Sequence, residues 1–98
     1  MSRDPSASLA RAIDRSAKEA GAAISLLSAS ASDWRSATFT GARHRLLFAA
    51  APSARLDEWV ALLPDVDLPM PGQLLAELSV RFSDRRIELD ALTLQDTR

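Results

Sequence analysis

Residues 73–94 read QLLAELSVRFSDRRIELDALTL, and this stretch decides the fold class. Through its first ten positions residues alternate between two sides, with the charged residues all on one of them, which is the two-residue period of a half-buried β-strand. The polar tripeptide at 83–85 interrupts the alternation as a turn, and a second alternating run follows it. The stretch therefore predicts a β-hairpin, with one strand over 73–82 and the other over 86–94.

The alternation also predicts which side chains of this hairpin are buried. One face of the first strand carries Leu74, Ala76, Leu78, Val80 and Phe82, and the other carries Leu75, Glu77, Ser79 and Arg81. In the second strand Ile87 and Leu89 point inward, whereas Glu88 and Asp90 point outward. The phase changes at Ala91 and Leu92, which predicts a bulge there or the end of the core contact.

A helix is predicted before this hairpin. Pro52 and Ser53 open it, and its buried stripe has the i, i+3, i+4, i+7 spacing of an amphipathic helix. The residues of that stripe are Leu56, Trp59, Val60 and Leu63. Pro64 ends the helix, because the residue before a proline is pushed out of helical geometry. The proline-rich residues 65–72 then predict an extended connector.

The N-terminal half repeats this order of elements. Asp4 or Ser6 caps a first helix, and Gly21 ends it by taking a left-handed conformation. The buried face of that helix carries Leu9, Ile13, Ala17 and Ala20. A long, irregular strand is expected from about 23 to 40, bent or broken near Asp33 and Trp34.

A turn at Gly41 and Ala42 is expected to connect that strand to a second one over 43–50. With this turn, one face of the hairpin carries Ala37, Phe39, His44, Leu46 and Phe48. The opposite face carries Ser36, Thr38, Arg43, Arg45 and Leu47.

The predicted fold is therefore α+β, with the order αββαββ and a four-stranded antiparallel sheet whose two helices pack on one face. This order is compatible with a permuted ferredoxin-like layout, although the strand order cannot be derived from the sequence. Residues 1–98 form a single domain in this interpretation, with tails at 1–4 and 95–98. The 47% hydrophobic and 26% charged residues are typical of a folded globular chain.

Composition excludes several classes of site. The chain has no cysteine, which removes disulfides, thiolate metal sites and cysteine nucleophiles. Its longest nearly uncharged stretch, residues 20–32, is shorter than the ~20 apolar residues of a membrane span. The N-terminus lacks the charged and apolar regions of a signal peptide, so a cytoplasmic protein is expected.

The sequence predicts no catalytic residue, metal site or cofactor. His44 is the only histidine, and a serine nucleophile would need it as base with a carboxylate behind it. We interpret it instead as a histidine at the edge of the core, with one hydrogen bond. Asp65 and Asp67 could face a divalent cation, but an Asp-x-Asp pair in a proline-rich loop is typical of turn chemistry and solvation.

The uncovered face of the sheet suggests a function in protein contact. Leucines that alternate away from the helices could form an apolar patch, and monomers seldom expose large ones. The predicted patch consists of Leu27, Leu47, Leu75 and Leu92, with Leu94 as a further candidate. We expect a homodimer, or contact with another protein, through this face. In the alternative, the first strand or the N-terminal helix covers it.

A second interpretation is binding of RNA or single-stranded DNA through Trp34, Arg43 and Arg45. Base stacking on a sheet aromatic with cations on phosphates is its physical requirement. The low aromatic fraction of 5% and the net charge of −1 argue against it. A small-ligand pocket near His44 is a third alternative. The preferred prediction is a non-enzymatic domain that associates with itself.

Overall fold

A computed structural model of the protein describes residues 5–95 and confirms the predicted order αββαββ. The elements are α1 (Pro5–Ala20), β1 (Ile24–Arg35), β2 (Thr40–Ala50), α2 (Ala54–Leu62), the short 3-10 helix η1 (Leu63–Asp65), β3 (Gln73–Ser83) and β4 (Arg86–Gln95). The predicted tail at 1–4, and residues 96–98 of the tail predicted at 95–98, lie outside the described residues. Gln95, which we assigned to the C-terminal tail, is instead the last residue of β4.

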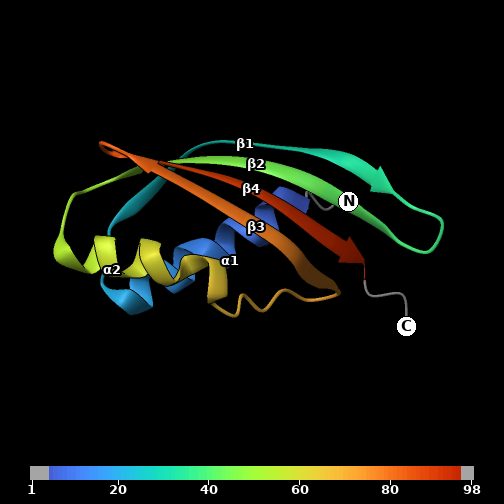
Figure 1. Ribbon diagram of the computed structural model, residues 1–98, viewed down its shortest axis with the longest axis horizontal. Coiled ribbons are helices and arrows are strands. Elements are labelled where there is room, and N and C mark those ends of the chain that lie inside the picture. The colour runs from blue at the N-terminus through green and yellow to red at the C-terminus, as the bar shows by residue number, and fades with distance from the viewer. Residues whose placement is uncertain (1–4, 96–98) are drawn as a thin grey trace.

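The four strands form one antiparallel sheet in the order β1-β2-β4-β3, and both helices lie on the same side of it (Figure 1). The predicted α+β class is therefore confirmed. The two central strands, β2 and β4, come from different hairpins, as in a ferredoxin-like sheet whose elements are cyclically reordered. We call the helix-covered side the inner face and the opposite side the outer face.

Helix α1 packs on the sheet through small and aliphatic side chains. Leu9, Ile13 and Ala17 are completely buried. The helix ends as predicted, because Gly21 takes a positive φ of 78° and the Ala22 N–H donates to the Ala17 carbonyl at 2.8 Å. Ser6, expected as a possible cap, lies inside the first turn and is buried.

Helix α2 begins as the sequence predicts. Ser53 is its N-cap, and the Ser53 hydroxyl accepts the Leu56 N–H at 3.0 Å. Leu56, Trp59 and Leu63 of the predicted stripe are buried. The α-helix ends at Leu62, and η1, which contains Pro64, connects it to the proline-rich connector.

The hairpin β1–β2 turns at residues 36–39, so the predicted turn at Gly41 and Ala42 is wrong. The Ser36 N–H donates to the Phe39 carbonyl at 2.9 Å, and the Ser36 hydroxyl accepts the Phe39 N–H at 3.0 Å. A serine hydroxyl thus supplies the turn chemistry that we had assigned to glycine. Ala37 and Phe39 therefore leave the strand face, and Phe39 is 52% exposed.

Gly41 lies inside β2, where a close approach requires it. A Cβ atom at this position would lie 2.0 Å from the Thr93 carbonyl oxygen of β4. Glycine therefore permits the backbones of β2 and β4 to meet at this row of the sheet.

The edge strands β1 and β3 each contain one bulge. In β1 the register jumps from Leu26 opposite Phe48 to Ser28 opposite Leu47, so Leu27 is the extra residue. The bend predicted near Asp33 is therefore misplaced.

In β3 the register jumps between Leu75 and Glu77, and Ala76 is the extra residue. Leu75 consequently packs with the core on the inner face, and Leu74 points outward with 59% of its surface exposed. Our assignment of these two leucines was reversed. We predicted a phase change at Ala91 of β4, but the shift occurs in its partner strand β3, at Ala76.

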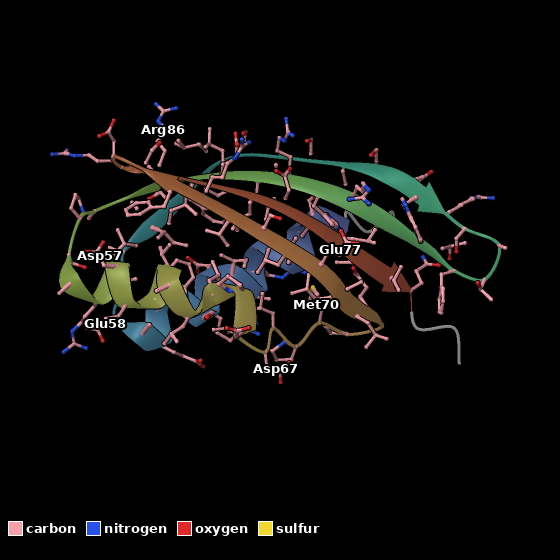
Figure 2. All side chains as sticks on the ribbon, in the orientation of Figure 1. Asp57, Glu58, Asp67, Met70, Glu77 and Arg86 are labelled. Carbon is pink, nitrogen blue, oxygen red and sulfur yellow. The ribbon has the colours of Figure 1, made fainter. Side chains whose placement is uncertain are left out.

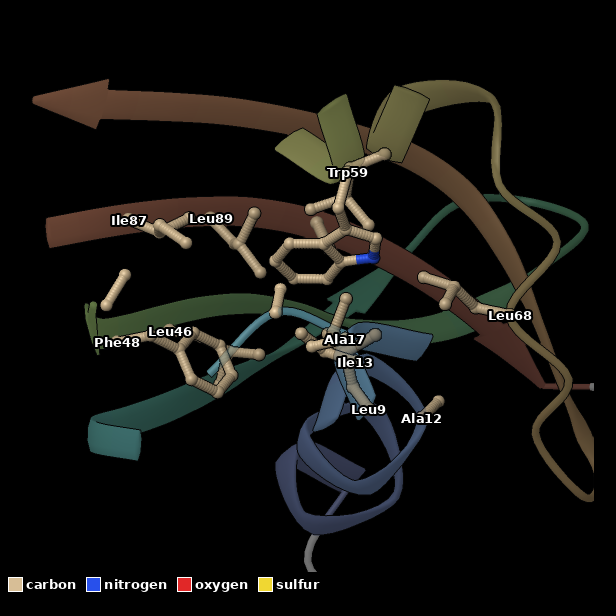
Figure 3. Close-up of a cluster of buried hydrophobic side chains, with 14 of the residues drawn as sticks. Leu9, Ala12, Ile13, Ala17, Leu46, Phe48, Trp59, Leu68, Ile87 and Leu89 are labelled. Carbon is tan, nitrogen blue, oxygen red and sulfur yellow. The ribbon is translucent and has the colours of Figure 1, made fainter. Parts of the chain in front are cut away.

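The core lies between the helices and the two central strands (Figure 3). It combines Leu9, Ile13 and Ala17 of α1, Leu46 and Phe48 of β2, Ile87 and Leu89 of β4, and Leu56 and Trp59 of α2. Trp59 also donates its indole N–H to the Ser16 hydroxyl at 2.9 Å, which joins the two helices.

Candidate functional site

The outer face of the sheet carries charged residues in cross-strand rows. One row is Ser32, Arg43, Leu92 and Glu77; the next is Ser30, Arg45, Asp90 and Ser79; and the third is Ser28, Leu47, Glu88 and Arg81. Ion pairs join Arg43 to Glu77 at 3.8 Å, Arg45 to Asp90 at 3.1 Å, and Arg81 to Glu88. Opposite charges on neighbouring strands contribute modestly to the stability of a sheet.

One of these ion pairs spans a whole strand. Arg43 and Glu77 belong to β2 and β3, which lie on either side of β4, roughly 10 Å apart. Their side chains must therefore lean toward each other above Leu92, which lies between them in the same row. Leu92 is accordingly only 4% exposed although it points to the outer face.

The predicted leucine patch is not continuous. Leu27 is 49% exposed at the β1 bulge, and Leu47 is half-buried on the outer face. Leu75 packs on the inner face, and Leu92 is covered by the ion pair above it. The additional candidate, Leu94, is half-buried on the outer face. The expectation that these residues form one outward apolar surface is wrong.

The residues of the nucleic-acid interpretation do share the outer face. Trp34 of β1 is directly opposite Gly41 of β2. Arg43 and Arg45 follow Gly41 at two-residue steps along β2, so alternation places all three residues of this interpretation on the outer face. Both arginines are balanced by carboxylates, and the pKa of Arg45 is raised by its hydrogen bond to Asp90 and by the charges of Asp90 and Glu88. A phosphate group would have to compete with these carboxylates.

His44 lies on the inner face with Leu46 and Phe48, but it is more deeply buried than the expected residue at the edge of the core, with 3% of its surface exposed, and it has two hydrogen-bond contacts instead of one. Its Nδ1 is 3.4 Å from the Ser6 hydroxyl of α1, and its Nε2 is 2.8 Å from the Thr93 hydroxyl of β4. Ser6 and Thr93 are buried as well. The three side chains form a polar link between α1 and the two central strands, closed to a substrate.

Replacing Thr93 by valine is expected to destabilise the fold by about 1–3 kcal/mol. The change keeps the shape of the side chain but removes the hydroxyl that faces the buried His44 Nε2. Urea denaturation measures the loss. Thr40→Val is the matched control, because the Thr40 hydroxyl donates to the exposed Gln95 side chain. Equal losses in the two variants would contradict a special role for the buried link.

Asp65 and Asp67, which the sequence indicated as solvated loop residues rather than as a cation site, lie at the end of η1 and in the connector after it. Asp65 and Asp67 are both exposed, and Figure 2 shows Asp67 on the connector, at the margin of the molecule away from the sheet. Within residues 5–95 no group of three or more histidine, aspartate or glutamate side chains is placed to hold a metal ion. Neither α1 nor α2 is long and apolar enough to cross a membrane.

The two sheet edges are the main features that the sequence did not reveal. Strand β1 is exposed along nearly all of its length at one edge. At the other edge, the inner side of β3 is only partly covered: Leu78 and Val80 are half-buried, and Phe82 is 36% exposed. Sequence alternation could show that these residues face inward, but not that β3 is an edge.

The helical layer explains the exposure of β3. Helix α1 packs against β1 and β2, and α2 packs against α1, whereas the contact with β3 comes from η1. The connector after η1 leaves an open depression beneath the start of β3, lined by Val66, Leu68, Met70, Leu75 and Leu78 among others. Met70 lies at this depression, between the connector and the sheet (Figure 2).

Bulges at Leu27 and Ala76 interrupt the two edge strands near one end, and the remainder of each edge is open to pairing. Free N–H and C=O groups along an edge can hydrogen-bond to another strand, and proteins commonly block them with proline or a covering segment. Neither β1 nor β3 contains proline.

A scan against protein-family models finds no match to this chain, and searches of curated proteins and of solved structures find none either.

Proposed function

We propose that this domain acts through protein contact, by associating with a second copy of itself along a sheet edge. One observation carries the proposal: β3 is an eleven-residue edge strand whose inner apolar side is incompletely covered by the helices. Pairing with another strand would satisfy its free backbone groups and cover the half-exposed apolar side chains.

The edge has more support than the outer face as the contact surface. Burying the outer face would place Arg43, Arg45 and Arg81 with their carboxylate partners inside an interface. Removing such charges from water is costly, and their mutual attraction offsets that cost only when the pairing geometry is near ideal. Lateral pairing of edges leaves these side chains in solvent.

Nucleic-acid binding, the alternative function, has less support. Its two arginines have carboxylate partners on the same face, and only one tryptophan stands near them. Salt-sensitive binding of a single-stranded oligonucleotide that weakens on removal of Arg43 or Arg45 would favour it over self-association.

Light scattering after gel filtration tests the proposal. We expect a mass of twice the 10.6 kDa chain, shifting toward the monomer on dilution. A monomer at every concentration would rule out self-association.

The variant Leu47→Arg separates the edge from the outer face in the same experiment. Leu47 lies on the central strand β2, away from both edges, so the variant should keep the native mass. Dissociation by Leu47→Arg would show that the outer face makes the contact, and the edge would have to be abandoned.

A further inference from the structure

We infer that two copies of the chain pair through β3, antiparallel, about a two-fold axis at Ser79. The inference rests on the proposed self-association and specifies its edge and its register. It joins the two four-stranded sheets into one eight-stranded sheet, with both helical layers on the same side.

The charges of β3 select this register. Glu77, Ser79 and Arg81 are successive outer-face residues of the strand, and all three are exposed. With the axis at Ser79, Glu77 of each copy lies directly opposite Arg81 of the other. An axis at Glu77 or at Arg81 would bring like charges face to face, which destabilises an antiparallel pair.

The in-chain partners extend these contacts into a network. Glu77 already faces Arg43 of its own chain, and Arg81 already faces Glu88. Across the proposed contact the order becomes Arg43, Glu77, then Arg81 and Glu88 of the second copy. Charges therefore alternate across four strand-to-strand spacings, and ion pairs contribute more in such networks than alone.

The inner face fits the same register. Leu78 of one copy lies opposite Val80 of the other, and both are half-buried in a single chain. Their contact would remove apolar surface from water at the place where the helical layer is thinnest.

Strand β1 is less suited to a defined pairing. Ser28, Ser30 and Ser32 form its outer side beyond the bulge and carry no charge. Its two charged residues, Asp33 and Arg35, are at the end of the strand beside the turn, so a pairing centred on them would be short. Strands with such small polar side chains specify their alignment weakly. The pattern that defines a partner alignment is therefore on β3.

Single-cysteine variants test the register, since the native chain has no cysteine. Directly opposite residues in an antiparallel pair have Cα atoms roughly 4.5–5.5 Å apart, within disulfide range. Under mild oxidation Ser79→Cys should form a covalent dimer rapidly, and Val80→Cys and Ser83→Cys should do so at least tenfold more slowly. Preferential cross-linking of Val80→Cys would overturn the register, and that of Ser30→Cys would overturn the choice of edge.

Charge reversal tests the same geometry without a covalent bond. Glu77→Arg and Arg81→Glu each place like charges opposite one another twice, so each should weaken self-association roughly tenfold or more. Mixing the two variants should restore a dimer that contains one copy of each, and so should the double variant E77R/R81E. Arg45→Glu, which breaks an ion pair on a central strand, is the matched control.

The outcomes separate the two proposals. If the native protein is a monomer, the proposed self-association is wrong. A native dimer that tolerates both charge reversals keeps self-association and overturns the β3 register. Circular dichroism of each variant, compared with the Arg45→Glu control, shows whether the fold remains intact.

Discussion

Replacing Gly41 by alanine is expected to lower the free energy of unfolding by about 3 kcal/mol or more. The new Cβ would lie 2.0 Å from the Thr93 carbonyl oxygen, and a backbone atom cannot rotate away as a side chain can. The two central strands would have to separate at this row, with strain and lost ladder hydrogen bonds. Urea denaturation followed by circular dichroism measures the loss.

Gly72→Ala is the control for this prediction. Gly72, unlike Gly41, has a positive φ, 71°, but nothing lies within 4 Å of the position of its Cβ. The cost there is only that of a left-handed conformation, about 1–2 kcal/mol. If Gly41→Ala is no more destabilising than Gly72→Ala, the close approach of β2 and β4 is not what requires glycine.

The second large effect is expected from Trp59→Ala, at about 3–5 kcal/mol. Trp59 is 3% exposed and is the largest side chain that α2 places in the core. Because α2 reaches the rest of the fold mainly through α1 and η1, a cavity at this position loosens the whole helix. Thermal and urea unfolding both measure the change.

Two milder variants separate the ring from its hydrogen bond. Trp59→Phe keeps an aromatic ring in the core but removes the indole N–H, and Ser16→Ala removes the acceptor. Each should cost about 1 kcal/mol. A Trp59→Ala loss as small as these would show that the ring does not anchor α2.

The helices could be predicted well from local signals. The Ser53 cap, the stripe from Leu56 to Leu63 and the stop at Gly21 depend on residues within a few positions of each other. Such signals need no tertiary partner. The order of elements and the α+β class followed from them.

The errors lie where a distant strand decides the local structure. Glycine at position 41 is typical of a turn, but here it is required by the close approach of the Thr93 carbonyl, 52 positions later. The polar link at His44 likewise depends on Ser6 and Thr93, which no spacing rule connects to it. Single-residue bulges cannot be located by alternation when apolar residues stand on both sides, as in Leu74, Leu75 and Ala76.

The surface prediction failed for the same reason. It assumed an unbroken alternation through 74–78, and the bulge at Ala76 exchanged the faces of two leucines. It also treated Leu92 as bare, because the sequence does not show that Arg43 and Glu77 meet above it. Self-association remains a prediction and now rests on the strand edge.

The extra residue in β3 shifts the alternation of inward and outward side chains along the sequence by one position. Before Ala76 one parity of residue numbers faces the helices, and after it the other parity does. Deleting Ala76 alone would leave Leu75 opposite Thr93 and Leu74 opposite Leu94, so both leucines would keep their faces and the strand would alternate without interruption. A protein with this fold but no extra residue here would therefore keep the polar and apolar order of 73–75 and carry it one position nearer to its counterpart of Glu77.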